Sequence, residues 1–495
     1  MAYRHGVFID EVPTSILPPV RVASGLPVVF GAAPVNMTDD PAAYVNKPFL
    51  AYTYAEAVAA LGFVDADPDG YFNFGLCEFM KSHFALFSSA PVVFVNLLDP
   101  ATHKESLTAV AATFVNDQAV VGYQGVLLST VVVKNSGGSL TYVAGVDYEL
   151  AFNDNGNLVV NRIAGGSILA GAVIAVDFDH LEPTMLTASD YIGGVDPLTG
   201  VATGLELIEQ VFPRFRMVPG IIVAPQGSTY PDVAAVMAAK SNNINGHFKA
   251  ISLVDIPTQA YTDGQDFITK YQDVAEYKND NNLTDPMQMV CWPMVKLGGS
   301  VYHMSTQLAG LICKVDGQNA DIPYRSPSNN NLQMDSAVIG DDLSEVFMGP
   351  DQAAYLNGEG VITALNFIGG WKSWGNRTAA YPASTDPKDT FMPTRRMFNW
   401  VGNTLTTTFW QRLDYPLNRR QIQTLVDSAN IWLNGLVAQQ YLIGARVEFL
   451  DEENTTTNLL DGIARFHVYM TPPSPNREID FVLEYDATYL TTLFG

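Results

Sequence analysis

Charge is scarce in this chain of 495 residues, and positive charge is the scarcer kind. Only 16% of the residues are charged, and 27 lysines and arginines stand against 51 aspartates and glutamates, which gives a formal charge of −24. A surface of that sign repels phosphate backbones and acidic lipid headgroups, so we expect neither nucleic acid nor a membrane as a partner. Since 47% of the residues are hydrophobic, the low charge indicates a folded chain rather than a disordered one.

Cysteines and long apolar runs are also rare. The cysteines are odd in number, far apart and without a CxxC pair, which predicts a reducing compartment. The longest apolar stretch, 168–176, is too short to cross a bilayer. Charged residues interrupt the first eleven positions, so we expect no secretion signal and expect assembly in the cytoplasm. The cysteines are Cys77, Cys291 and Cys313.

Motifs that carry enzyme chemistry are missing from the sequence. It contains no GxxxxGK[ST], no GxGxxG after a strand, no GxSxG and no HExxH. The histidines are scattered without the spacing of metal ligands, and each is expected to be a surface or packing residue. We therefore predict no catalytic residue, no cofactor and no metal site. The histidines are His5, His83, His103, His180, His247, His303 and His467.

One segment begins like a calcium loop. Residues Asp65–Gly70 place carboxylates at the first, third and fifth positions and glycine at the sixth. The twelfth position is Leu76, where such a loop needs a bidentate glutamate, and Pro68 stiffens the turn. The pattern favours a solvated acidic turn.

Four short β-rich runs alternate with helix candidates at 231–240 and 263–278. Near-continuous apolar runs are typical of strands that are covered on both faces of a parallel sheet. The β-α-β-α order predicts a three-layer α/β domain. The four runs are 91–98, 221–224, 250–254 and 289–294.

The α/β order is interrupted by about a hundred residues, enough for a separate domain. Between 126 and 178 the pattern changes to short strands and turns, and Asn155-Gly156 is a strong hairpin signal between 147–152 and 158–163. We interpret residues 104–196 as an all-β insertion.

The C-terminal third predicts an α+β domain. Thr394 is a candidate cap for one helix, and the apolar stripe from Ile422 to Val437 predicts a second. Segments 445–450 and 463–470 predict a β-hairpin.

Both ends of the chain read as extended arms. Residues 6–12 alternate like a strand before a run of prolines, and they either pack on their own domain or reach a neighbour. Prolines at 472, 473 and 475 separate a last alternating strand, 478–486, from the hairpin. Such a strand can add to the edge of another sheet.

Several segments, in order along the chain, resemble the contractile tail sheath proteins of phages and R-type bacteriocins. The most specific block runs from Leu356–Val361 to Trp374–Thr378 and is similar to the family's "LN..GV…WGNRT" pattern. The resemblance spans nearly the whole chain except 104–196, a region that varies among relatives. The other segments are Tyr3–Val7, Asn46–Pro48, Arg216–Gly220, Met289–Pro293, Arg395-Arg396, Tyr469–Pro475 and Phe481–Leu490.

The resemblance implies a subtilisin-like α/β domain without protease chemistry and a C-terminal domain that faces an inner tube. The implied parts are an arm at 1–25, the α/β domain at 26–103 and 197–375, the insertion at 104–196, the C-terminal domain at 376–475 and a second arm at 476–495. It also implies that arms of two subunits join the hairpin of a third in an interlocked sheet. The implied contacts are Val7, Phe8, Ile9 and Val12 in the first arm, Ile479, Phe481, Leu483 and Tyr485 in the second, and Val447, Phe449, Phe466 and Val468 in the hairpin.

The function that the resemblance implies is structural. The subunit would polymerise as stacked hexameric rings around the tail tube protein, contact baseplate and terminator proteins, and contract to drive the tube through the host envelope as part of a virion tail. The sheath of an R-type bacteriocin or of a related injection system is the alternative, and an α/β hydrolase is a more distant one.

Overall fold

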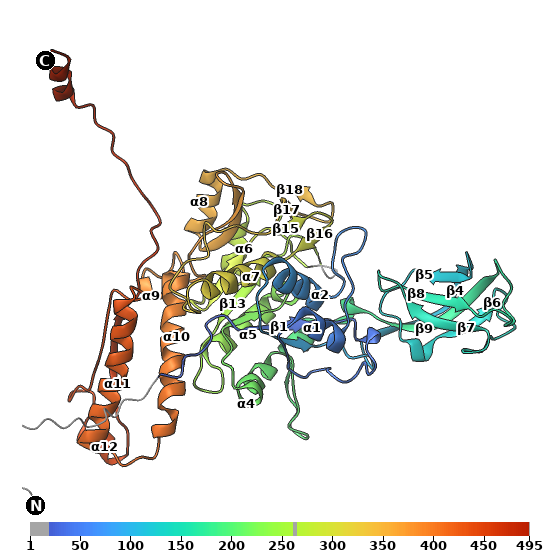
Figure 1. The fold of residues 1–495 in the computed structure, drawn as a ribbon, viewed down its shortest axis with the longest axis horizontal. Coiled ribbons are helices and arrows are strands. Elements are labelled where there is room, and N and C mark those ends of the chain that lie inside the picture. The colour runs from blue at the N-terminus through green and yellow to red at the C-terminus, as the bar shows by residue number, and fades with distance from the viewer. Residues whose placement is uncertain (1–18, 261–264, 495) are drawn as a thin grey trace, which may run out of the picture.

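The computed structural model describes residues 19–260 and 265–494. A central α/β body carries an all-β unit at one end and a pair of long helices at the other, and the C-terminal segment leaves the body as an extended arm (Figure 1). None of the helices among the described residues has the length and apolar character needed to cross a membrane.

The body is built on an eight-stranded sheet with the order β2-β3-β1-β12-β13-β14-β19-β20. Neighbouring strands are parallel except at the two edges, where β2 and β20 run antiparallel. The bounds are β1 Pro27–Gly31, β2 Phe49–Ala51, β3 Val92–Asn96, β12 Ile221–Val223, β13 Ile251–Asp255, β14 Gln288–Cys291, β19 Val361–Asn366 and β20 Trp371–Trp374.

Five of these strands, β1, β3, β12, β13 and β14, are buried at every residue. Because successive side chains of a strand point to opposite faces, both faces of the sheet are covered. The four apolar runs of the sequence contain β3 and β12 entirely and all but one residue of β13 and of β14, so the prediction of covered parallel strands is confirmed.

Helices α2 and α7 pack against each other and against the sheet, and α5 packs against β12 and β13. Helix α5 begins at Pro231, as predicted, because a proline at the first helical position loses no hydrogen bond. The body's helices are α1 Tyr54–Leu61, α2 Gly75–Met80, α3 Ala188–Ile192, α4 Val211–Phe215, α5 Pro231–Asn242, α6 Val274–Asp280, α7 Met304–Gly317, α8 Pro350–Gly358 and α9 Pro387–Thr390.

The helix expected at 263–278 is wrong in its bounds. Residues 261–264 lie outside the described part of the chain, and helix α6 begins only at Val274. The backbone of Ile268 is engaged elsewhere: its N–H donates to the Pro257 carbonyl at 2.8 Å, and its carbonyl accepts from the Trp292 indole at 3.2 Å. Phe267 is 46% exposed, so little packing supports a helix there.

Two small sheets complete the body. One has the order β16-β15-β17-β18 and the other pairs β10 with β11. Their bounds are β10 Gly194–Val195, β11 Ala202–Thr203, β15 Met294–Leu297, β16 Ser300–Tyr302, β17 Ser336–Ile339 and β18 Ser344–Glu345.

The all-β unit consists of two three-stranded sheets, β4-β9-β6 and β5-β8-β7, around a core of its own. The hairpin expected at Asn155-Gly156 is present: the Asn153 side chain accepts from the N–H groups of Asn155 and Asn157, each at 3.0 Å. Gly156 has φ 73°, a conformation that favours glycine. The strands are β4 Lys104–Thr113, β5 Gln118–Val121, β6 Val132–Asn135, β7 Tyr148–Phe152, β8 Leu158–Arg162 and β9 Val173–Leu181.

The C-terminal part has a separate core in which the Trp400 and Trp432 rings lie 5.7 Å apart. Helix α10 begins at Met392, so Thr394 lies in its first turn and is not the cap. Helix α11 covers the predicted stripe but ends at Ala438, before Gly444. The elements are α10 Met392–Phe409, α11 Arg419–Ala438, β21 Gly444–Glu448, α12 Thr456–Leu460 and β22 His467–Thr471.

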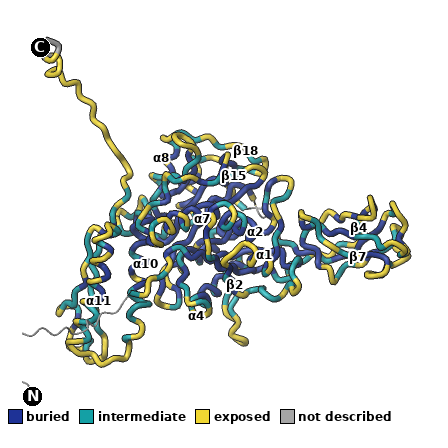
Figure 2. Tube along the Cα trace, viewed as in Figure 1, coloured by how far each residue is buried: buried dark blue, intermediate teal, exposed yellow. Residues whose placement is uncertain are grey.

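The predicted last strand at 478–486 forms no ladder in this chain. The segment is extended and exposed along its length (Figure 2). No strand edge of the same chain pairs with it among the described residues, so its backbone groups are left to solvent.

Candidate functional site

The C-terminal hairpin is the first candidate for an assembly site. Strands β21 and β22 pair antiparallel, and Val447 lies directly opposite Val468. Val447 is 4% exposed because it packs into the core beneath α11. Phe449 and Phe466 lie just beyond the paired residues, so the ladder is shorter than predicted, yet their rings lie 5.4 Å apart.

One edge of this hairpin is closed by a side chain. Asn430 of α11 accepts from the Val447 N–H at 2.8 Å and donates to the Val447 carbonyl at 3.0 Å. An asparagine amide that bonds both groups of one residue imitates a neighbouring strand. Nothing in the sequence pattern singled out Asn430.

The opposite edge, along β22, is open. The N–H and the carbonyl of Val447 both face Asn430, so Val447 and Val468 form a non-hydrogen-bonded pair of the antiparallel ladder. The N–H and the carbonyl of Val468 therefore point away from β21. Within the described residues β22 has β21 as its single strand neighbour. The outer edge of β22 can therefore accept another strand.

A hollow of about 410 Å³ lies between the hairpin and the ends of α10 and α11. Its lining is mainly apolar, and Leu413 at its rim is 60% exposed. Exposed apolar surface beside an open strand edge is typical of a protein–protein contact. The apolar lining includes Leu405, Phe409, Leu413, Leu417, Leu425, Val447, Ala464, Phe466 and Val468.

The C-terminal arm presents apolar side chains that none of the residues described by the structure covers. Ile479, Phe481, Leu483 and Tyr485 are 65%, 85%, 95% and 79% exposed. Large apolar side chains are costly to leave in water in such a row, so the arm is suited to bind another surface.

The structure brings some of the predicted contacts together and leaves others apart. The four hairpin residues cluster at β21 and β22, whereas the four residues of the C-terminal arm extend away from them (Figure 1). The first-arm residues Val7, Phe8, Ile9 and Val12 lie outside the described residues.

A buried ion pair ties the C-terminal helices to the body. Arg396 of α10 binds Asp316 of α7 through both guanidinium arms, and both side chains are 3% exposed. Ser24 Oγ donates to the same carboxylate at 2.7 Å. Three segments far apart in sequence are thereby fixed to one another.

A second buried network lies inside the body. His303 Nδ1 lies 2.8 Å from Glu78 Oε2, and Asp255 accepts from the Ser305 N–H at 2.9 Å and from Ser228 Oγ at 3.1 Å. Burial opposes charge on His303, but the Glu78 carboxylate, the hydrogen bond to it and Asp255 outweigh burial and raise the pKa of His303. Burial raises the pKa of Asp255.

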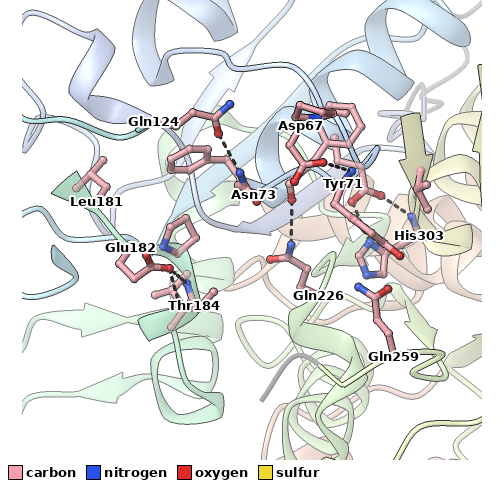
Figure 3. A pocket seen from close by; sticks show the side chains of 18 of the residues that line it. Asp67, Tyr71, Asn73, Gln124, Leu181, Glu182, Thr184, Gln226, Gln259 and His303 are labelled. Carbon is pink, nitrogen blue, oxygen red and sulfur yellow. Dashed lines mark hydrogen bonds and ion pairs between the residues drawn. The ribbon is translucent and has the colours of Figure 1, made fainter. Parts of the chain in front are cut away.

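This network borders a pocket of about 810 Å³ between the body and the all-β unit (Figure 3). Several polar side chains of the pocket wall bond within the protein: Asn73 donates to Gln124 at 2.9 Å, and Gln226 donates to the Phe72 carbonyl at 3.1 Å. Ser228, the hydroxyl bonded in the network, donates to Asp255, so its proton is directed at a carboxylate and not at an imidazole. The arrangement holds β13, α2 and the start of α7 together, which is a structural role.

The predicted calcium-like segment is a turn. Asp67 Oδ1 accepts from the N–H groups of Asp69 and Tyr71 at 3.0 and 2.9 Å, and Asp65 pairs with Lys81 at 2.6 Å. Two of the three carboxylates are thus occupied by the protein itself.

Known proteins similar to this chain are tail sheath proteins. The tail sheath protein of Burkholderia phage BcepMu is 27% identical over 517 residues, which cover 100% of this chain and 99% of the phage protein. A prophage major tail sheath protein of Pseudomonas aeruginosa is 24% identical over 64% of this chain and 78% of its own. No family model matches the chain.

Solved structures share the fold. The sheath of the PVC extracellular contractile injection system, in its contracted state, matches with a TM-score of 0.57 and 14% identity over 99% of both chains. The contracted helical sheath of the anti-feeding prophage matches with a TM-score of 0.57 and 14% identity over 98% of this chain and 100% of its own. The expected mixed α/β, multidomain fold is confirmed. Along its whole length the chain is therefore similar in sequence to a phage tail sheath protein, and it shares its fold with the sheaths of contractile injection systems.

Proposed function

We propose that this chain is the structural subunit of a contractile tail sheath, which polymerises as helically stacked rings around an inner tube and contracts to drive that tube through a host envelope. Two features carry the proposal: the outer edge of β22 is open, and the exposed apolar arm has no strand partner within residues 19–260 and 265–494.

The arm and the edge are complementary in chemistry. A strand added to β22 would satisfy the backbone of Val468, and side chains on one of its faces would enter the hollow beside Phe466. Because Asn430 closes β21, arms add on the β22 side: one pairs with β22, and the next pairs with the outer edge of the first. Residues 7–12 of one subunit and 479–485 of another supply these strands.

The parts of the chain take separate roles in this proposal. The body, 26–103 and 197–375, is a subtilisin-like domain without protease chemistry and forms the contacts between subunits that change on contraction. The C-terminal unit, 376–475, faces the tube. Within the expected insertion at 104–196, the part formed by β4 to β9 decorates the outside, because it sits at the far end of the body from the C-terminal helices and so stays clear of the tube (Figure 1). The arms, 1–25 and 476–495, are the links.

Contraction needs bodies that stay rigid and links that bend. The Arg396–Asp316 pair fixes the C-terminal helices to the body, so the two move together. The prolines at 472, 473 and 475 keep the arm out of the hairpin and make it a tether. When one surface of a subunit binds a different surface of the next subunit, and the rotation that relates the two does not close a ring, the subunits form a helical stack. The extended stack relaxes to a packing of lower free energy, and no nucleotide is required.

The partners follow from this role. They are further copies of the chain, an inner tube protein, and the baseplate and terminator proteins at the two ends. The particle is a phage tail or a related injection device, and a capsid gene beside the coding sequence would decide for the phage.

The first test removes an arm. Electron microscopy of the full-length protein and of a variant that lacks residues 1–20 should show tubes of stacked rings for the first and none for the second. Monomers from both at high concentration would refute the assembly proposal.

A finer test uses neighbouring positions of the C-terminal arm. Phe481 and Val482 are 85% and 92% exposed and point to opposite faces of the extended segment. F481E should abolish tubes because it places a charge in the apolar contact, whereas V482E, with the same charge, should retain them. Equal loss in both variants would contradict the assigned face.

A further inference from the structure

The all-β unit joins the body through a narrow neck, where β4 begins and β9 ends. Glu105 and His180 are direct cross-strand partners in this antiparallel pair. Glu182 follows two residues after His180, just beyond β9, so its side chain returns to the same face. One ligand atom from each of the three side chains lies within 4.8 Å of the others.

His180 is oriented as a metal ligand. The residue is 7% exposed, and its Nδ1 lies 3.2 Å from the Leu181 carbonyl oxygen. A carbonyl only accepts, so Nδ1 carries the proton, and in the neutral ring Nε2 is left with its lone pair. That Nε2 is buried without a hydrogen-bond partner and faces Glu105 Oε2 at 3.7 Å.

The carboxylates are not neutralised by basic side chains. Lys104 and Ser106, the neighbours of Glu105, point to the other face of the sheet and bind Asp179. Among the described residues, neither Glu105 nor Glu182 forms an ion pair with a lysine or arginine. Glu182 holds the Thr184 N–H and hydroxyl through Oε1, which fixes its position and leaves Oε2 available.

We propose that Glu105, His180 and Glu182 form a binding site for a divalent transition-metal ion, with zinc as the best match. One imidazole and two carboxylates suit zinc, whereas calcium and magnesium prefer oxygen ligands alone. Tetrahedral bonds of about 2.1 Å place ligand atoms roughly 3.4 Å apart. The 3.7 Å between His180 Nε2 and Glu105 Oε2 is near that value, and the exposed Glu105 side chain has room to move.

The role of this ion is to clamp the neck. It joins the first residues of β4 to the last of β9, where the two connections to the body begin, and so restrains the all-β unit against the body. His180 and Glu182 also line the large pocket, from which water completes the coordination.

The test titrates untagged, EDTA-treated full-length protein with Zn²⁺ and with Co²⁺ as a coloured probe. One ion should bind per chain, and E105Q should weaken binding by about tenfold or more. Glu105 is exposed, so this variant leaves folding intact. The matched control is E453Q, which removes the same charge from a glutamate that also lies beside a histidine: Glu453 pairs with His467 at 2.7 Å in the C-terminal hairpin. E453Q should bind zinc as tightly as the wild type.

A second readout separates this site from metal bound elsewhere. Zinc should slow hydrogen exchange at residues 104–107 and 178–182 in the wild type and not in the E105Q/E182Q double variant. No binding of zinc or cobalt, or equal affinity in the double variant, overturns the proposal. Zinc that binds without changing exchange at the neck overturns it as well.

Discussion

Removal of one partner from the Arg396–Asp316 pair should destabilise the joint between the C-terminal helices and the body. Both side chains are 3% exposed, so R396M leaves the Asp316 carboxylate buried without its cation. The Ser24 hydroxyl still donates to that carboxylate but carries no charge. An uncompensated buried charge costs roughly 3–5 kcal/mol. We expect R396M and D316N each to lower the free energy of unfolding by about that amount.

The assay is equilibrium unfolding in urea, followed by tryptophan fluorescence. Trp400 and Trp432 lie in the core that this joint supports, so their signal reports its loss. The double variant R396M/D316L should cost much less than the sum of the two single variants, because it leaves no unpaired charge.

The control is R446M, which removes the pair between Arg446 and Glu448 at the surface. Their side chains are 59% and 40% exposed, and such pairs contribute about 1 kcal/mol or less. If R396M were no more destabilised than R446M, the joint would not depend on the buried pair, and our account of a rigid link would fail.

Three further outcomes are expected. G360A should destabilise the fold, because Gly360 has φ 73° and an added Cβ would lie 2.5 Å from the Tyr381 carbonyl oxygen. G358A should be tolerated, because a Cβ added at Gly358 would meet open space. Similar thermal midpoints for the two variants would contradict this. Burial lowers the pKa of Lys278 from 10.5 to about 8, although the charge of Glu359 acts in the opposite direction. Between about pH 8 and 10.5 the lysine is therefore protonated in the unfolded state and neutral in the folded state. Stability relative to K278M should therefore rise as the pH increases from about 8 to 10.5, and a pH-independent difference in urea midpoints would refute it. Low ionic strength should hinder polymerisation, since subunits of charge −24 repel one another more strongly when unscreened, and a yield of tubes independent of salt would count against this.

The elements that the sequence predicted best are the strands that are buried along their whole length. The runs at 91–98 and 221–224 became strands because every residue in the centre of a covered parallel sheet is buried, and burial leaves a continuous apolar signal. The Asn155-Gly156 turn was predictable because its geometry is local. The start of α10 was placed three residues late because Thr394 is a good cap by type, whereas the cap position in the structure is Phe391 and the helix begins at Met392.

The sites could not be predicted in the same way because they depend on distant pairs. Glu105 and His180 meet through the register of β4 and β9, and the intervening sequence, 106–179, carries no sign of it. Asn430 looks like any polar residue on a helix until the hairpin is placed beside it. The apolar arm residues at 479–485 were recognisable by their alternation, but their complete exposure required the structure.

The amide of Asn430 also bears on the period before assembly begins. Under the proposed function, copies of this chain meet one another before they join a stack. A hairpin with two open edges could join other hairpins on both sides and form ribbons without end, which is the usual hazard of exposed strands. With β21 occupied by its own helix, two hairpins can meet along β22 alone, and such a pair has no edge left to extend. Under the proposed function, closure of β21 therefore keeps free subunits out of ribbons and leaves them available for the stack.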